Sequence, residues 1–248
     1  MGAAMGIGEE FITQTKYHNL GPSDQMRGVR PLPALEAGHD PGLAVLELPG
    51  PGTIEVKAVD VRSAIEQRKS VRRYTEAPLM LEELSYLLWC TQGVRQVVHA
   101  AATMRNVPSA GARHAFETYI LANNVKGLSP GMYRYLALDH RLLQLDAAPD
   151  VSDLVVAACL GQEFVRSCAV VFIWVAVPYR MTWRYGERGY RYLYLDAGHV
   201  AQNLYLSAAS VGCGVCAIAA FSDDSMNQLL GLDGETQFAI YVATAGKL

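Results

Sequence analysis

The sequence predicts an α+β fold built as one large domain. The chain has 248 residues, of which 51% are hydrophobic and 18% are charged, so it can bury a substantial core. Apolar residues recur at helical spacing in some segments and as short β-forming runs in others. These two kinds of segment do not alternate strictly as βαβ units, which favours an α+β fold over a doubly wound one.

Residues 1–54 are predicted to be an N-terminal arm followed by a linker rich in proline and glycine, and residues 55–248 the domain itself. The arm carries apolar residues that it could bury against the domain or a partner subunit, and we expect one helical turn in it; the alternative is a disordered tail. These residues are Phe11, Ile12, Tyr17 and Leu20. Five prolines predict an extended conformation for residues 30–52. They are Pro31, Pro33, Pro41, Pro49 and Pro51.

The domain is expected to begin with two helices. A short amphipathic run over residues 61–67 predicts the first. From Leu81 onward, leucines recur at helical spacing and predict the second helix, whose apolar stripe should face the core. Glu82 and Glu83 lie near its start, where the helix dipole favours acidic residues, and Gly93 is expected to end it.

Strands are predicted further along the chain. A loop of small residues over 106–114 precedes an alternating, β-rich segment over 116–122, and residues 131–135 form another short strand. Residues 169–177 are a continuous apolar run of β formers and predict a central strand buried on both faces. A helix is expected between these strands over residues 152–160.

The remaining third of the chain is predicted to contain a loop and a long helix. The stretch from residue 179 to 194 is dense in aromatic residues and arginine, and we expect a loop there. A helix should follow from about Tyr194 to Val211, and its small residues around Gly198 suit the core of a dimer. The last expected elements are a turn and strand over 212–221, a helix over 223–231 and a strand over 237–244.

Composition excludes several classes of function. The net charge is −3 and the pI about 6.1, which argues against nucleic acid as a partner. No run of 18 apolar residues predicts a membrane span, and the N-terminus lacks the pattern of a signal peptide. Five cysteines, mostly in apolar contexts, fit reduced thiols, so a cytoplasmic location is expected. The six histidines show no metal-binding spacing, so no metal is predicted; the single CxxC at Cys213 and Cys216 is weak evidence for zinc or redox chemistry.

The stretch from Glu66 to Thr75 is the strongest candidate for a binding site. It places four cations around Ser70, and they are Arg68, Lys69, Arg72 and Arg73. Arginine offers a planar fork of donors and serine a hydroxyl, a combination that suits a phosphate-bearing ligand. The alternative is a solvated basic turn.

Arg68, Ser70 and Arg72, followed by Tyr74, resemble the N-terminal flavin signature of the nitroreductase family. Further motifs agree in order and spacing, and they are Pro108-Ser109-Ala110-Gly111, Gln162, Tyr190-Arg191-Tyr192, Ala197-Gly198-His199, Gln202-Asn203-Leu204, residues 212–221 and Gly246-Lys247. Over roughly residues 55–248 the chain is similar to the nitroreductase superfamily, and within it to the SagB-type branch, which includes flavin dehydrogenases that oxidise azolines to azoles in peptides. The Lys16-Tyr17-His18 segment of the arm also resembles that branch.

The resemblance implies a central, mainly antiparallel sheet flanked by helices, in a domain-entwined homodimer with FMN at the subunit interface. It implies that Arg68, Ser70 and Arg72 meet the phosphate, ribityl and pyrimidine groups, with Lys69 in the same cluster. The cofactor set would also contain Pro108, Ser109, Ala110 and Gly111 of the other subunit, Gln162 at the polar edge of the flavin, the backbone of Ile218, Ala219 and Ala220 beside N5, and Lys247 near the phosphate. More familiar nitroreductases often have Glu-Gly where this chain has Ala219-Ala220, so substrate handling is expected to differ.

Two functions follow from this sequence. The first is an FMN-dependent oxidoreductase that uses NAD(P)H or an organic substrate, acting on a nitro or quinone acceptor or on a ring-containing peptide. The second is a non-catalytic flavin-binding or scaffold protein that assists a peptide-modifying complex. In the first, Arg180, Trp183 and Tyr190 would shape the substrate side of the flavin; alternatively this aromatic and basic stretch packs the dimer interface.

Overall fold

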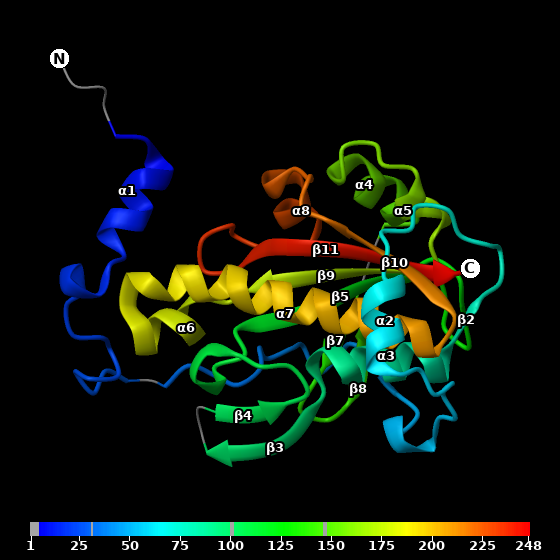
Figure 1. Ribbon diagram of the computed structural model, residues 1–248, viewed down its shortest axis with the longest axis horizontal. Helices are drawn as coiled ribbons and strands as arrows, with labels where there is room; N and C mark the ends of the chain where they lie inside the picture. The colour runs from blue at the N-terminus through cyan, green and yellow to red at the C-terminus, as the bar shows by residue number, and fades with distance from the viewer. Residues whose placement is uncertain (1–4, 31, 100–101, 146–147) are drawn as a thin grey trace.

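A seven-stranded sheet forms the centre of the protein in the computed structural model, which describes residues 5–30, 32–99, 102–145 and 148–248 (Figure 1). Its order is β1-β8-β7-β5-β9-β11-β10, and every neighbouring pair is antiparallel. The predicted α+β class and the antiparallel sheet are therefore confirmed. The strands are β1 Val45–Glu47, β5 Phe116–Ala122, β7 Gly131–Leu136, β8 Arg141–Gln144, β9 Val170–Ala176, β10 Cys213–Ile218 and β11 Phe238–Lys247.

Helices cover both faces of this sheet. The helices α3 and α7 pack on one face, and α4, α5 and α8 lie on the other (Figure 1). The helices are α1 Ile7–Gln14, α2 Val61–Gln67, α3 Leu81–Gln92, α4 Val151–Ala158, α5 Phe164–Ser167, α6 Pro178–Tyr185, α7 Gly189–Ser210 and α8 Asp223–Leu229. Within the described ranges, none of them is long and apolar enough to cross a bilayer.

Strand β9 divides the core into two layers, as its continuous apolar run predicts. Successive side chains of a strand point to opposite faces. Phe172 and Trp174 pack with the α3 and α7 side, where their rings stack at 6.1 Å, whereas Ile173 and Val175 pack with the α4 and α8 side. All four are fully buried, so the prediction of a central strand buried on both faces is confirmed.

Capping explains where the two N-terminal helices of the domain begin and end. The Asp60 carboxylate accepts the Ser63 N–H at 2.9 Å and starts α2. The Glu83 carboxylate accepts the Met80 N–H at 2.9 Å and starts α3. Gly93 ends α3 as expected, and the reason is space: a Cβ there would lie 2.3 Å from the Trp89 ring.

The prediction of a loop over residues 179–194 is wrong. Helix α6 occupies Pro178–Tyr185, and α7 begins at Gly189, five residues before the predicted start. Pro178 suits the first turn of a helix because its missing N–H would have no intrahelical partner. Gly186, with φ of 55°, separates the two helices.

The N-terminal arm lies against α6 and α7 of its own chain and contains the two-turn helix α1, more helix than predicted. The Arg188 guanidinium donates to the Thr15 carbonyl at 2.7 Å, and the Arg191 Nε donates to the Thr15 hydroxyl at 2.6 Å. The Tyr17 and Tyr192 hydroxyls lie 2.9 Å apart. The arm therefore wraps the domain, which was one of the two expected alternatives.

The predicted linker is extended only in part, because it contains a turn at residues 41–42 and runs into a 3-10 helix over Pro51–Thr53, and it does not separate the arm from the domain. Strand β1 pairs with β8 at the edge of the main sheet, and the Ala37 N–H donates to the Glu117 carboxylate at 2.8 Å. The boundary expected at residue 54 therefore does not mark a break in packing; Pro31 lies outside the described residues. The sequence analysis also missed β8 and two small sheets, which are β2 Leu79–Met80 with β6 Val125–Lys126, and β3 Val94–His99 with β4 Ala102–Arg105.

Candidate cofactor site

The basic stretch after α2 lies directly on the exposed edge of β10. The Val71 N–H donates to the Val215 carbonyl at 2.8 Å, and Ser70 forms a single bridge with Val215. This approach needs glycine on the sheet, because a Cβ at Gly214 would lie 2.7 Å from Val71. Tyr74 anchors the end of the stretch, since its hydroxyl donates to the Val71 carbonyl at 2.8 Å.

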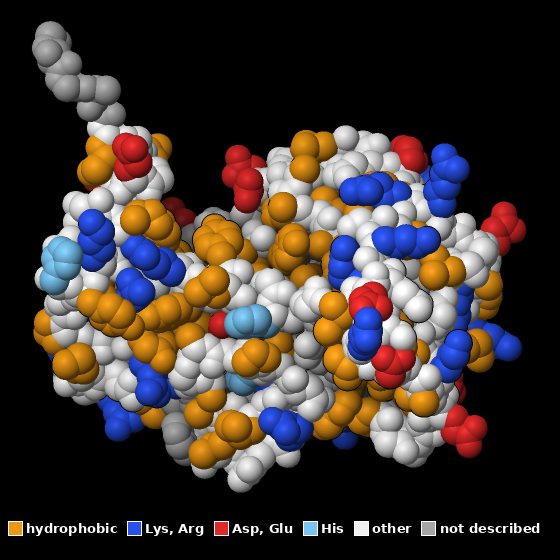
Figure 2. Space-filling view, in the orientation of Figure 1, with side chains coloured by type: hydrophobic (Ala, Val, Ile, Leu, Met, Phe, Trp, Pro, Cys, Tyr) orange, Lys and Arg blue, Asp and Glu red, His pale blue; other side chains and the backbone are white. Residues whose placement is uncertain are grey.

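The cations of this stretch are exposed and carry unneutralised positive charge. None of the four forms an ion pair with an acidic side chain in the part of the chain that the structure describes. They are Arg68, Lys69, Arg72 and Arg73. Figure 2 shows Lys and Arg side chains at the end of the molecule where α2 lies. Unpaired guanidinium groups beside an exposed hydroxyl suit a phosphate, so the residues fit the anionic end of FMN.

Tyr205 of α7 contacts both Ser70 and Arg68 of this stretch. The sequence did not predict this role. The Tyr205 hydroxyl lies 3.1 Å from the Ser70 hydroxyl and accepts the Ala217 N–H at 2.9 Å. The Arg68 guanidinium lies over its ring, 5.2 Å from the centroid, within cation–π range. The sequence shows an aromatic residue here in a helix of small residues. It does not show that this side chain faces β10, because that depends on how the helix is turned in the fold.

The chain leaving β10 offers free backbone donors. Ala219 and Ala220 are exposed, and their N–H groups have no acceptor among the described residues. Gln162 reaches this segment from the other layer, and its side-chain amide donates to the Ala220 and Cys159 carbonyls, each at 2.9 Å. Donors in this position fit the polar edge of a flavin ring.

The Pro108–Gly111 loop lies near the other end of α7. The Ala110 N–H faces the Asp196 carboxylate, with its nitrogen 3.2 Å and 3.3 Å from the two oxygens. Asp196 and Tyr205 are nine residues apart, or about 13 Å along a helix. The predicted cofactor residues therefore form two separate groups in one chain, with Arg68, Ser70 and Ala219 in the first and this loop in the second.

Four predicted residues are placed otherwise than expected. The Lys247 ammonium donates to the Glu83 carboxylate at 2.6 Å and to the Val211 carbonyl at 2.7 Å, so its charge is neutralised by Glu83. Arg180 is 3% exposed and pairs with Glu117, and Trp183 is 6% exposed. These two side chains are enclosed by their own chain, which contradicts their prediction as substrate-side residues. Tyr190 is half-buried against the core.

The CxxC is not arranged as a redox pair. Cys213 and Cys216 are three residues apart on β10, so their side chains point to opposite faces of the strand, and both are buried free thiols. Burial raises the pKa of Cys213 to about 12 and also raises the pKa of Cys216. In the described ranges, no three metal-ligating side chains gather into a site.

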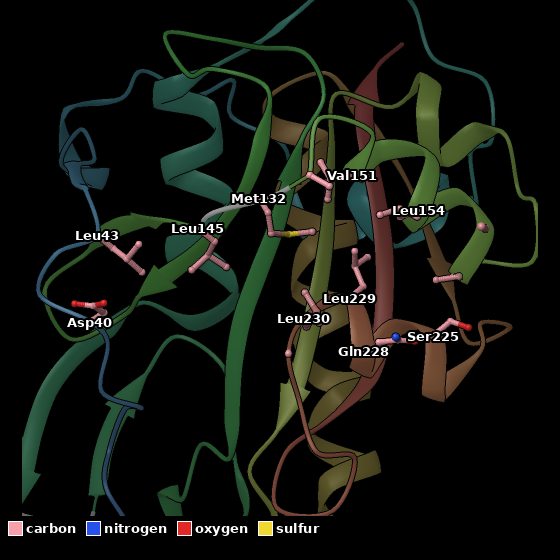
Figure 3. Close-up of a pocket in the computed structure, with 14 residues that line it drawn as sticks. Asp40, Leu43, Met132, Leu145, Val151, Leu154, Ser225, Gln228, Leu229 and Leu230 are labelled. Atoms are coloured by element: carbon pink, nitrogen blue, oxygen red, sulfur yellow. The ribbon is translucent and has the colours of Figure 1, made fainter.

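Two large cavities lie on the two sides of the sheet. One, of about 820 Å³, lies between α7 and the chain leaving β10, and Figure 2 shows the molecule hollowed there. Its lining includes Tyr194, Gly198, Ala219, Phe221 and Tyr241. The other, of about 930 Å³, lies on the α4 and α8 side (Figure 3) and contains none of the predicted cofactor residues. A smaller cavity, of about 190 Å³, is lined by Arg68, Lys69 and Tyr205, so it adjoins the Arg68 stretch, whereas the 820 Å³ cavity adjoins Ala219.

The fold and this geometry define an α+β protein with an exposed cluster of unpaired cations at the edge of an antiparallel sheet. The chain belongs to the Nitroreductase family, which it matches over residues 65–247. It is 36% identical over 186 residues to the "Putative nitroreductase MJ1384" of Methanocaldococcus jannaschii, covering 75% of this chain and 89% of that protein. A crystal structure of a "putative nitroreductase" from Ralstonia eutropha superposes with a TM-score of 0.67 at 26% identity, covering 89% of this chain and 95% of that one.

More distant similarities extend to a trifolitoxin operon protein, a microcin synthetase complex and a flavin complex. The trifolitoxin operon protein TfxC of Rhizobium leguminosarum is 26% identical over 205 residues, and this chain spans 56% of its length. The E. coli microcin synthetase McbBCD complex shares the fold at 17% identity, with a TM-score of 0.60 over all of this chain and 84% of that one. A Desulfovibrio desulfuricans family structure in complex with FMN also shares it, at 18% identity and a TM-score of 0.52, over 77% of this chain and 87% of that one.

Proposed function

We propose that this chain is an FMN-dependent oxidoreductase. The observation that carries the proposal is the juxtaposition of unpaired cations with free backbone donors on one sheet edge. Arg68 and Ser70 stand at one end of this edge, and the free N–H groups of Ala219 and Ala220 at the other. An elongated ligand with a phosphate at one end and a polar ring at the other matches this spacing of charge and donors. Family membership and the FMN-bound family structure support the same assignment.

The residues of this chain would bind and orient the cofactor, and bound FMN would supply the electron transfer itself. Arg68, Lys69 and Ser70 would hold the phosphate and ribityl chain. Arg72, whose guanidinium lies 5.9 Å from the Phe164 ring centroid, would favour negative charge at the pyrimidine edge. The Ala219 backbone would donate toward the ring, and Gln162 fixes that backbone through its bond to the Ala220 carbonyl.

A homodimer completes this proposal. The Pro108–Gly111 loop and the Arg68 group of one chain contact α7 at Asp196 and Tyr205, which lie about 13 Å apart along the helix. Next to Asp196, on the loop side of α7, the apolar residues Tyr194 and Leu195 are 61% and 60% exposed. A second copy packed on this face would cover it and bring its own loop to the first chain's site.

The cavity beside Ala219, which Tyr194 and Gly198 of α7 also line, would accept the substrate. The similarity to TfxC and to the microcin synthetase complex supports placing the chain in the SagB-type branch, with a modified peptide as substrate. The alternative substrates are a nitro or quinone acceptor with NAD(P)H as donor. A non-catalytic flavin-binding role in a peptide-modifying complex is the second candidate, because Ala219 offers no side-chain acid or base at the proposed ring position.

The test is to purify the full chain, record the visible flavin spectrum and titrate the apo-protein with FMN. Steady-state oxidation of NADH and NADPH with a quinone acceptor is then measured, together with dehydrogenation of an azoline-containing peptide. Flavin binding with turnover in either assay supports the oxidoreductase, whereas flavin binding without turnover supports the non-catalytic role. A chain that binds no FMN contradicts the proposal.

A further inference from the structure

Asp196 is a buried carboxylate that the proposed flavin contacts do not use. It lies in α7 and is 4% exposed. The Ala110 N–H faces both of its oxygens, and the Ser109 side chain also hydrogen-bonds to it. Burial raises the pKa of Asp196, while these hydrogen bonds and nearby His199 lower it. A buried carboxylate costs free energy unless such partners compensate, so its hydrogen bonds to this loop are its main stabilising contacts.

The loop that Asp196 contacts has a conformation that few residues could adopt. Gly111 has φ of 59°, and a Cβ there would lie 2.4 Å from the Tyr185 hydroxyl. The Ser109 hydroxyl accepts the His114 N–H at 2.9 Å, which turns the loop back toward β5. Tyr185 of α6 therefore limits the loop from one side, and the Asp196 carboxylate holds its backbone from the other.

We propose that Asp196 is a positioning residue that fixes the Ser109–Gly111 backbone and thereby sets the FMN affinity of the site in the partner subunit. The inference rests on the proposed function, in which this loop meets the cofactor bound by the other chain. Asp196 itself lies behind the loop and would not touch the flavin. Its effect on binding is therefore indirect and crosses the subunit interface.

The first experiment measures FMN dissociation constants of the full-length dimer for Asp196→Asn and Asp196→Ala. Asparagine keeps one acceptor oxygen for the Ala110 N–H, whereas alanine keeps none. We expect the Kd for FMN to rise about tenfold or more in Asp196→Ala and to rise by a smaller factor in Asp196→Asn. Ser207→Ala is the matched control, because Ser207 is buried in the same helix and donates to the Asn203 carbonyl; its Kd should stay within about twofold. Equal Kd values for wild type and both Asp196 variants would overturn the inference.

The second experiment uses mixed dimers, in which FMN affinity recovers only if Asp196 acts on the site of the partner subunit. A merely structural effect of Asp196 on its own chain would not produce this recovery. Arg68→Ala and Asp196→Asn chains carrying different tags are co-expressed, and the mixed dimer is isolated. If Asp196 acts on the partner's site, one site of this dimer holds both changes and the other holds neither, so half of the sites regain wild-type affinity. If Asp196 acts within its own chain, each site holds one change and neither recovers, which would overturn the inference. Failure of the proposed function would be seen separately, as a wild-type protein that binds no FMN.

Discussion

Replacing Arg68 by alanine should weaken FMN binding about 10- to 100-fold without unfolding the protein. Arg68 is exposed and has no acidic partner in the described part of the chain, so its guanidinium is free to bind a phosphate. A hydrogen bond to a charged group contributes about 1.5–3 kcal/mol, and each 1.4 kcal/mol is about tenfold in affinity. The apo-protein loses only an exposed contact with the Tyr205 ring, worth about 0.5–1 kcal/mol, so its unfolding midpoint should change little.

The assay is a fluorescence titration of apo-protein with FMN and, in parallel, with riboflavin. Riboflavin lacks the phosphate, so Arg68→Ala should reduce FMN affinity and leave riboflavin affinity nearly unchanged. Arg68→Lys should fall between wild type and alanine, because lysine keeps the charge but loses the planar fork of donors. Higher ionic strength should reduce the difference between wild type and alanine, since the site is exposed.

Arg62→Ala is the control for a simple change of charge. Arg62 lies on α2, which directly precedes Arg68, but its guanidinium pairs with Glu66 at 2.8 Å and its side chain is 84% exposed. Its loss should change FMN affinity by no more than about twofold. The assignment of Arg68 to the phosphate is refuted if Arg68→Ala binds FMN as the wild type does, or if it weakens riboflavin binding by the same factor.

Three further changes test other parts of the structure. Leu195→Glu should produce a monomer without flavin in sedimentation analysis, because it places a charge on the exposed apolar face of α7. The control Leu160→Glu, which changes another exposed leucine, should stay dimeric. A flavin-loaded Leu195→Glu monomer would contradict the shared site. Arg180→Ala should lower the free energy of unfolding by about 3–5 kcal/mol in urea titrations, since it leaves buried Glu117 unpaired, and a loss below about 1 kcal/mol would contradict this. Burial, with a smaller contribution from the charge of Arg105, lowers the pKa of His114 to about 3. As the pH falls below about 6.5, only the unfolded chain binds this proton. The free energy of unfolding should therefore fall by about 1.5 kcal/mol between about pH 6.5 and about pH 5. In His114→Asn the loss should be smaller by this amount, while His140, whose pKa burial also lowers, still contributes in the same direction; an unchanged slope would show that His114 does not contribute.

The elements that the sequence predicted well are those with a strong local pattern. The leucine spacing of α3 and the continuous apolar run of β9 depend only on near neighbours in the chain, and both were predicted to within a residue or two. The sequence did not predict helix α6, because one face of this helix is buried by a segment far away in the chain. Trp183 donates to the Val29 carbonyl at 3.2 Å, so one face of this polar-looking stretch is buried under the arm.

The candidate site divides in the same way. The cations of the Arg68 stretch are consecutive in sequence, and their chemistry is visible without a structure. Arg180 is as basic, but its partner Glu117 is 63 residues away, and only the fold shows that the pair is internal. Tyr205 and Asp196 were missed because their roles depend on which side of α7 faces β10 and which faces the loop.

Helix α7 links cofactor binding to dimerisation in the proposed site. Tyr205 supports the Arg68 group and Asp196 supports the loop, and the rigid helix keeps these supports about 13 Å apart. In the proposed dimer, a flavin held by the Arg68 group of one chain contacts the loop of the other chain. A ligand that binds only the dimer stabilises it by mass action, so added FMN should lower the dimer dissociation constant, and dilution should release FMN and dissociate the subunits together. The exposed apolar residues Tyr194 and Leu195 lie next to Asp196, where such an interface would form.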